Sequence, residues 1–322
     1  MGRYILTRLA LSVPTIIGVA FLSFMLMRLV PGDVILAQIG GGDAAGGVAD
    51  IDPEILARIR EDLGLQGTVP EQFGRWIVGI AHGDFGESYL THNDSLDQFW
   101  SRFPVTLQLG LMAVAMSSVL GVTVGVISAL FQDGPADYSL RLVAILGLSI
   151  PNFFLGVLMV IFLARTVHYV FPVGVNQIWD DPVTNFRQFS IPSVVLAVAS
   201  AGVIARLTRT SLLEVMRQDY VRTAFSKGLT TRMVVTRHAL KNALIPVVTI
   251  VGAQLTFIIS GSVVVEQIFN LRGVGQLTIT SLFQRDYVQL QTNIFLFGLV
   301  LVAGNLITDL MYGFLDPRIR YN

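Results

Sequence analysis

Residues 103–132 read "FPVTLQLGLMAVAMSSVLGVTVGVISALFQ", a run of 30 residues without a single Asp, Glu, Lys or Arg. The hydrocarbon core of a bilayer is crossed by about 20 predominantly apolar residues in helical form. This stretch is therefore long enough to span a membrane, and it predicts a transmembrane helix.

Five further charge-free segments of comparable length occur in the 322-residue chain: 9–27, 142–164, 188–205, 242–265 and 287–308. Only 14% of all residues are charged and the mean hydropathy is +0.65, whereas about a quarter of the residues of a soluble domain are charged. The first segment is too long for the apolar region of a signal peptide, and "MLMRLVPGD" offers no small-residue cleavage site. The predicted fold class is an all-α polytopic membrane protein with six transmembrane helices.

The distribution of charge predicts the orientation of these helices. Lys and Arg are enriched in cytoplasmic segments of membrane proteins. With a cytoplasmic N-terminus, 13 of the 22 cations lie on the inner side and 16 of the 22 acids on the outer side. The opposite orientation would place the basic segment 206–241 outside. We therefore expect both termini to be cytoplasmic.

The expected domain organisation has three parts. An N-terminal tail and first span occupy residues 1–29, and a small extracytoplasmic subdomain occupies 30–102. The membrane core, residues 103–322, holds spans at 103–132, 139–170, 188–210, 242–266 and 287–315, with a cytoplasmic loop at 211–241.

Two short helices are expected in the extracytoplasmic subdomain. In "DPEILARIREDLGL", Asp52 suits a helix N-cap, Pro53 the first turn and Gly64 the end of an amphipathic helix. A second helix is expected in "PEQFGRWIVGIAHG". The subdomain has too little apolar content for a large independent core.

Several polar or helix-breaking residues fall inside the predicted spans. Pro151, in "SIPNFF", predicts a kink or local opening of the third span. Asn152, Gln254 and Asn305 place amides within spans, where such groups either bond across helices or line a pathway. Pro151 and these three amides are the candidate pathway residues, and both interpretations remain open at this stage.

Several function classes are disfavoured by what the sequence lacks. No span carries a charge near its middle, which argues against a proton-coupled carrier. The two lysines, in "FSKGL" and "ALKNA", form no phosphate-binding loop, so ATP hydrolysis would require another chain. Cysteine is absent and the four histidines do not pair at ligand spacing, so no metal site is expected. The zero net charge suggests no nucleic-acid partner, and no Ser/His or paired-Asp arrangement lies at span depth to suggest an intramembrane enzyme.

The segment 219–248, "DYVRTAFSKGLTTRMVVTRHALKNALIPVV", combines positive charge with helix-capping signals. Asp219 is expected to cap a helix over 220–227 that Gly228 ends in a left-handed conformation. Thr230 or Thr231 then caps a second helix leading into the fifth span. The cations are about five residues apart and lie on no single helical face, which fits a membrane-surface helix poorly. Topology alone explains the charge but leaves the capped short helix unexplained.

This segment resembles a known family. "TAFSKGL" followed by "RHALKNALIPVV" is similar to the EAA loop of ABC importer permeases, and most similar to the dipeptide, oligopeptide and nickel branch. The resemblance covers nearly the whole chain and includes "MLMRLVPGD", "PEQFGRWIVGIAHGDFGES", "RFPVTLQLGLMA", "LSIPNFFLGVLM", "VVVEQIFNLRGVGQL" and "DLMYGFLDPRIR".

The resemblance implies that residues 220–228 form a coupling helix seated in a groove of an ATPase subunit. Arg222, Thr223 and Ala224 take the positions of the motif's Glu-Ala-Ala, and Gly228 that of its glycine. The missing Glu, and the 17 residues between Gly228 and Pro246, depart from the general motif but look usual for the peptide branch. The expected coupling residues are Tyr220, Arg222, Thr223, Ala224, Lys227 and Gly228.

The resemblance also implies partners and a mechanism. A second homologous permease, two ATPase subunits that bind ATP and Mg²⁺, and an extracytoplasmic substrate-binding protein would assemble with this non-catalytic chain in a bacterial or archaeal plasma membrane. Access to the substrate would alternate between the two sides, driven through the coupling helix. Within 266–286, which forms either a re-entrant turn or a plain loop, the residues expected to face the binding protein are Glu266, Arg272, Gly273 and Asp286.

The expected substrate is a peptide. Nickel chelates and oligosaccharides are the alternatives within the same architecture. A self-sufficient channel or secondary carrier is a less favoured second class.

Overall fold

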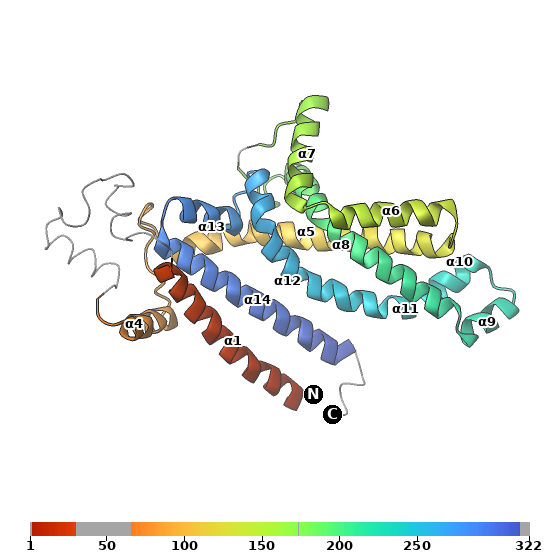
Figure 1. Ribbon diagram of the computed structural model, residues 1–322, viewed down its shortest axis with the longest axis horizontal. Helices are drawn as coiled ribbons and strands as arrows, with labels where there is room; N and C mark the ends of the chain where they lie inside the picture. Colours follow the sequence, from red (N-terminus) through yellow and green to blue (C-terminus); the bar gives the residue numbers. More distant parts are fainter. Residues whose placement is uncertain (1, 30–65, 173, 316–322) are drawn as a thin grey trace. The chain divides into compact units, whose positions relative to one another are not determined.

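A computed structural model describes residues 2–29, 66–172 and 174–315 (Figure 1). Contacts divide the chain into two compact units, residues 1–104 with 274–322 and residues 105–273. Over the described ranges the regular structure is helical, apart from one isolated bridge between Glu87 and Asp94. The expected all-α class is confirmed.

Four helices are long and apolar enough to cross a membrane: residues Ile5–Leu26 of α1 (Gly2–Leu29), α5 (Ser95–Leu130), α8 (Pro182–Met216) and residues Tyr287–Asp309 of α14 (Tyr287–Leu315). Two bent pairs pass the same test together. They are α6 (Pro135–Ser149) with α7 (Asn152–Thr166), and Thr231–Ala243 with the first part of α12 (Ile245–Ile268). Counting each pair as one span gives six, as a polytopic membrane protein of the expected kind requires.

The break at Pro151 is much sharper than the kink expected in the third span. α6 and α7 meet at 103°, and α7 stands nearly upright on α6 in Figure 1. Ile150, the residue before the proline, is extended with ψ 121°, because the proline ring disfavours helical backbone at the preceding position. Pro151 is the N-cap of α7, so the proline separates two helices.

In the first unit, α1 and α14 run antiparallel side by side (Figure 1). Arg8 and Asp309 form an ion pair of 3.0 Å between them. α4 (Val69–Ala81) confirms the second of the two short helices predicted within 30–102. Trp76 of this helix meets Phe295 of α14 edge-on at 5.5 Å between ring centroids. The backbone N–H of Thr68 donates to the Glu71 carboxylate at the start of α4, which lowers the pKa of that carboxyl. The helix expected to begin near Asp52 lies outside the described residues.

In the second unit, small residues allow α5 and α8 to pack closely. A Cβ placed at Gly121 would lie 2.8 Å from the Ala201 carbonyl oxygen, and one at Gly125 would lie 2.6 Å from that of Ala205. These two glycines form the G-x-x-x-G pattern "GVTVG", which lets membrane helices approach backbone to backbone. Because the two helices approach this closely, α5 needs glycine at both positions.

The segment 266–286 is not a plain loop. Its central part is α13 (Val274–Phe283), a short apolar helix that packs on α14 within the first unit. The residues before it, up to Gly273, belong to the second unit, where Phe269 is buried against α7.

Candidate coupling site

The basic loop forms α9 (Asp219–Ser226), which follows the C-terminus of α8 after two residues. Gln218 occupies the N-cap, and Asp219 is already the first helical residue, so the prediction that Asp219 caps the helix is wrong by one position. The Asp219 carboxylate lies instead 3.7 Å from the Arg222 guanidinium, with both side chains largely exposed. A carboxylate in the first turn remains favourable there because the helix N-terminus carries partial positive charge.

Gly228 ends α9 as the sequence predicts. Its φ is +80°, in the left-handed region that glycine adopts at little cost. The N–H of Gly228 donates to the Phe225 carbonyl at 2.9 Å, and the N–H of Leu229 donates to the Ala224 carbonyl at 3.4 Å. This pair of bonds is a Schellman motif, which satisfies carbonyls at the helix end.

One face of α9 is buried against its own unit. Val221 and Ala224 pack in a cluster with Leu212 and Val215 of α8 and with Val234, which follows the turn. Side chains packed to native density transmit displacement because such interiors are hardly compressible. α9 is therefore held as a rigid projection from the end of α8.

Most of the other side chains of α9 are exposed. Of the expected coupling residues, Tyr220, Arg222, Thr223, Lys227 and Gly228 are exposed. Ala224 is 6% exposed. A direct ATPase contact by the Ala224 side chain does not fit this geometry, because it anchors the helix instead.

Phe225 is an exposed residue of α9 that the sequence analysis did not single out. It lies four positions after the buried Val221, a spacing that predicts burial on the same helical face, yet 39% of its surface is exposed. Phe225 therefore adds an exposed aromatic to a helix whose exposed residues also include Arg222, with Lys227 at its C-cap.

The second half of the loop leads into α12 in several pieces. α10 (Thr231–Met233), a π-helix η2 (Val234–Ala239) and α11 (Leu240–Ala243) precede the 51° bend before α12. Thr230 is at the N-cap position of α10, although its side chain makes no capping bond. The Tyr220 hydroxyl accepts from Asn242 Nδ2 at 2.8 Å and so ties α9 to this segment. π-Helical turns are rare and frequently occur at functional sites.

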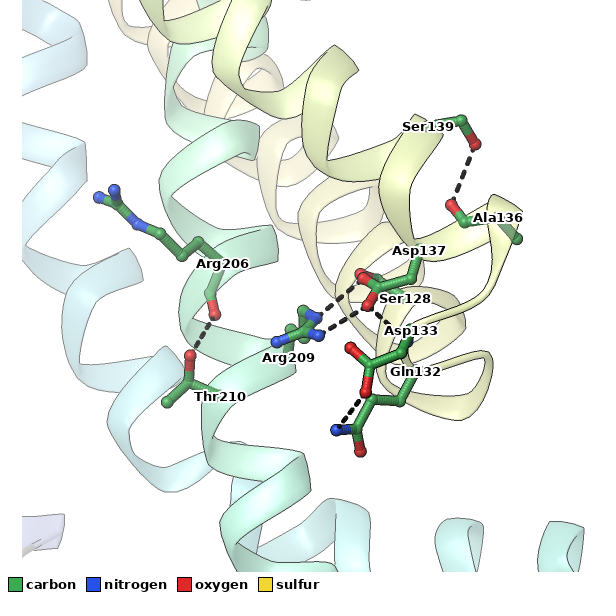
Figure 2. A network of polar contacts seen from close by, with 9 residues as sticks. All are labelled: Ser128, Gln132, Asp133, Ala136, Asp137, Ser139, Arg206, Arg209 and Thr210. Carbon is green, nitrogen blue, oxygen red and sulfur yellow. Dashed lines mark hydrogen bonds and ion pairs between the residues drawn. The ribbon is translucent and has the colours of Figure 1, made fainter.

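A buried ion pair braces the helices that carry α9 (Figure 2). Arg209 of α8 donates from Nε to Asp137 Oδ1 at 2.9 Å and from Nη2 to Oδ2 at 2.6 Å. The Ser128 hydroxyl and the Asp133 N–H also donate to this carboxylate, which is fully buried. A bidentate pair of this kind fixes orientation as well as distance. The two partners are 72 residues apart, and the sequence alone did not indicate that they meet.

The candidate pathway residues belong to both units. Asn152 begins α7 and follows the exposed Pro151. Gln254, on α12 of the same unit, has a buried Oε1 with no hydrogen-bond partner among the described residues. Asn305 is on α14 of the other unit, where it lines a cavity of about 170 Å³ with Arg8 and others. A pathway role for these four residues remains a prediction.

Three of the four residues expected to face a binding protein are buried. The Glu266 carboxylate accepts from Thr106 at 2.8 Å and from Ser262 at 3.0 Å. Gly273 is buried as well, and a Cβ at that position would collide with Glu266.

Asp286, the third of these, is buried at the start of α14. It accepts from the backbone N–H of Gln289 and from the Ser88 hydroxyl. Only Arg272 of the four is exposed. The side chains of Glu266 and Asp286 and the backbone of Gly273 are packed inside the chain, which argues against direct contact with a binding protein. That role stays a prediction for Arg272.

The fold is that of the permease subunits of ABC importers. It is similar to a chain of the MetNI methionine ABC transporter, solved in inward-facing conformations, with a TM-score of 0.56 and 19% identity over 69% of this chain and 97% of that one. Such low identity concerns the fold alone.

The sequence assigns the family. Residues 121–321 match the binding-protein-dependent transport system inner membrane component, and residues 1–110 match the N-terminal part of such membrane components. The chain belongs to this family of transport permeases. It is 37% identical to a putative peptide transport system permease protein of Brucella abortus over 322 residues, the full length of both chains. It is 35% identical to a glutathione transport system permease protein of Pectobacterium atrosepticum, with both chains fully covered. It is also 34% identical to a di/tripeptide transport system permease protein of Pseudomonas aeruginosa, over all of this chain and 99% of that one.

Proposed function

We propose that this chain forms one half of the translocation pathway of an ATP-driven importer for di- and oligopeptides. The full-length relatives carry names that refer to peptides, di/tripeptides and glutathione, which is itself a tripeptide. These names favour a peptide over the nickel chelates and oligosaccharides that the resemblance left open.

The observation that carries the coupling role is the geometry of α9. The helix is short, closed by a Schellman turn, anchored by Val221 and Ala224, and exposed along its other face. Such a projection can seat in a groove of an ATPase subunit and pass its movement to α8 and α12. The coupling residues on the exposed face are then Tyr220, Arg222, Thr223 and Lys227, with Phe225 added from the structure and Gly228 setting the turn.

The remaining components of the proposed transporter are separate chains. They are a second homologous permease that lines the other half of the pathway, two ATPase subunits that bind ATP and Mg²⁺, and an extracytoplasmic substrate-binding protein. In this proposal the chain performs no catalysis and resides in the plasma membrane of a bacterium or archaeon with both termini cytoplasmic. The excess of Lys and Arg on the inner side supports that orientation.

The coupling surface is tested by truncating its exposed centre. Phe225→Ala combined with Arg222→Ala should reduce co-purification with the ATPase subunits and abolish ATP hydrolysis stimulated by the loaded binding protein. Both side chains are exposed, so folding should be unaffected. Arg217→Ala removes an exposed charge just before α9 and serves as the matched control. Full assembly and full stimulation in the double variant would rule out this face as the ATPase contact.

The substrate class is tested on the cognate binding protein. A calorimetric screen against di-, tri- and longer peptides, oligosaccharides and nickel chelates should detect binding in the peptide series. Selective binding of a nickel chelate or a sugar would reject the peptide assignment while leaving the coupling mechanism intact.

A further inference from the structure

A tight hairpin spans residues 86–95, between α4 and α5, within the first unit. Glu87 and Asp94 face each other across it as an antiparallel bridge. The N–H of Ser88 donates to the Asn93 carbonyl at 2.9 Å, and the N–H of Ser95 donates to the Gly86 carbonyl at 3.0 Å. Its tip presents Tyr89 and Leu90, which are 44% and 47% exposed. Large apolar side chains at the end of a rigid, projecting turn are suited to enter a depression on a partner.

Hydrogen bonds connect the 86–95 hairpin to the start of α14. Gln289 Nε2 donates to the Ser95 carbonyl at 3.1 Å, and the Thr292 hydroxyl donates to the carbonyl of Phe85, just before the hairpin, at 3.3 Å. Ser88 adds its hydroxyl bond to the buried Asp286. These bonds pre-order the hairpin, so little conformational entropy remains to be lost when a partner binds its tip.

The polar groups beneath the hairpin are not all satisfied within the described part of the chain. Ser95 Oγ, Gln289 Oε1 and Asn293 Nδ2 are buried atoms without a hydrogen-bond partner there, and each of these residues is at most 1% exposed. Buried polar atoms are nearly always bonded. These unbonded donors and acceptors can form new hydrogen bonds when a partner binds the hairpin.

The hairpin and the residues next to it in the sequence carry four exposed carboxylates, Asp84, Glu87, Asp94 and Asp97, between the cations Arg75 and Arg102. Arg285, before the Asp286 that bonds Ser88, is an exposed cation near its base. Four carboxylates disfavour insertion of this surface into lipid, because charged groups are costly there. They favour a protein partner whose surface carries Lys and Arg around an apolar depression.

We propose that the 86–95 hairpin is the docking element for the extracytoplasmic substrate-binding protein, which holds Tyr89 and Leu90 in an apolar depression with a basic rim. The inference rests on the proposed function, since the family depends on a binding protein and the predicted topology places this hairpin outside. The hydrogen bonds to Gln289, Thr292 and Asp286 then connect the docked hairpin to the N-terminal end of α14.

The first test measures affinity between the complete transporter in nanodiscs and its ligand-loaded binding protein. Tyr89→Ala combined with Leu90→Ala should raise the dissociation constant at least about tenfold, as expected when interface anchors are truncated. Trp179→Ala, which removes an exposed aromatic from the loop before α8, should leave it unchanged. Glu87→Gln should slow association and reduce its dependence on salt.

The second test uses the absence of cysteine in the chain. Leu90→Cys creates a single thiol, and a membrane-impermeant maleimide should label this chain quickly from the outside. The loaded binding protein should slow that labelling, whereas Trp179→Cys should label at the same rate with and without it.

The possible outcomes separate this inference from the proposed function. Wild-type affinity in the hairpin variants, or labelling of Leu90→Cys that the binding protein does not slow, would overturn the hairpin inference alone. A thiol that stays unlabelled from the outside would show that the tip is in lipid or on the inner side, and would overturn it too. Failure of the wild-type transporter to bind or respond to any binding protein would reject the proposed function, and the hairpin inference with it.

Discussion

Replacing Gly228 tests whether the turn after α9 is needed for coupling. The residue has φ +80°, and a Cβ at this position would have no atom within 4 Å. The cost of a side chain is therefore conformational and involves no clash. An L-residue in the left-handed region costs about 1–2 kcal/mol, which shifts a local equilibrium by a factor of about 5–30. Asn tolerates this region better than Ala, and a β-branched residue tolerates it worst.

The expected result is a graded loss of coupling in the order Gly228→Asn, Gly228→Ala, Gly228→Val. In proteoliposomes, the ratio of ATP hydrolysed to substrate transported should rise along this series as the turn opens and α9 loosens. Gly174 has φ +100° and equally open surroundings, so Gly174→Val imposes a comparable strain in the loop before α8 and should leave the ratio unchanged. Equal ratios for Gly228 and all three of its variants would refute the rigid-projection argument.

Two further substitutions test the packing around this site. Asp137→Asn leaves the largely buried Arg209 guanidinium without its counter-charge. It should destabilise the protein by about 3 kcal/mol, the lower end for a broken buried pair. Asp309→Asn breaks a half-exposed pair and should cost at most about 1 kcal/mol, so equal apparent melting temperatures for the two variants in detergent would contradict this assignment. Gly273→Ala forces a methyl group against the Glu266 carboxylate and should lower thermal stability by about 1–3 kcal/mol, whereas Gly18→Ala, which meets no atom within 4 Å, should be nearly neutral.

The sequence predicted the membrane class because that prediction needs only composition and length. Charge-free runs long enough to span a bilayer are visible without tertiary information, and the helix over α9 with its Gly228 turn follows from local capping rules. The difference at Asp219 is a single position, within the usual uncertainty of helix boundaries.

Other features depended on contacts that no local pattern reveals. The sequence places Glu266 at the end of a span and Asp286 just before one, yet a hydroxyl from a distant segment bonds each of them inside the fold: Thr106 bonds Glu266 and Ser88 bonds Asp286. Phe225 has the spacing of a buried residue and is exposed. In both cases long-range packing decided the environment, which helical periodicity alone cannot specify.

In the proposed function, the buried ion pair and the α9 anchor would let one short helix move larger ones. Arg209 locks α8 to α6 through Asp137, and three residues further along α8, Leu212 belongs to the cluster that holds Val221 of α9. The ion pair and the α9 contact are therefore about one helical turn apart on α8, and no flexible loop separates them. On the other side, the path to α12 runs through the π-helical segment and the 51° bend. Motion at α9 should thus reach α6 and α8 as a rigid group, and the bend before α12 is the place where the second unit can change its angle.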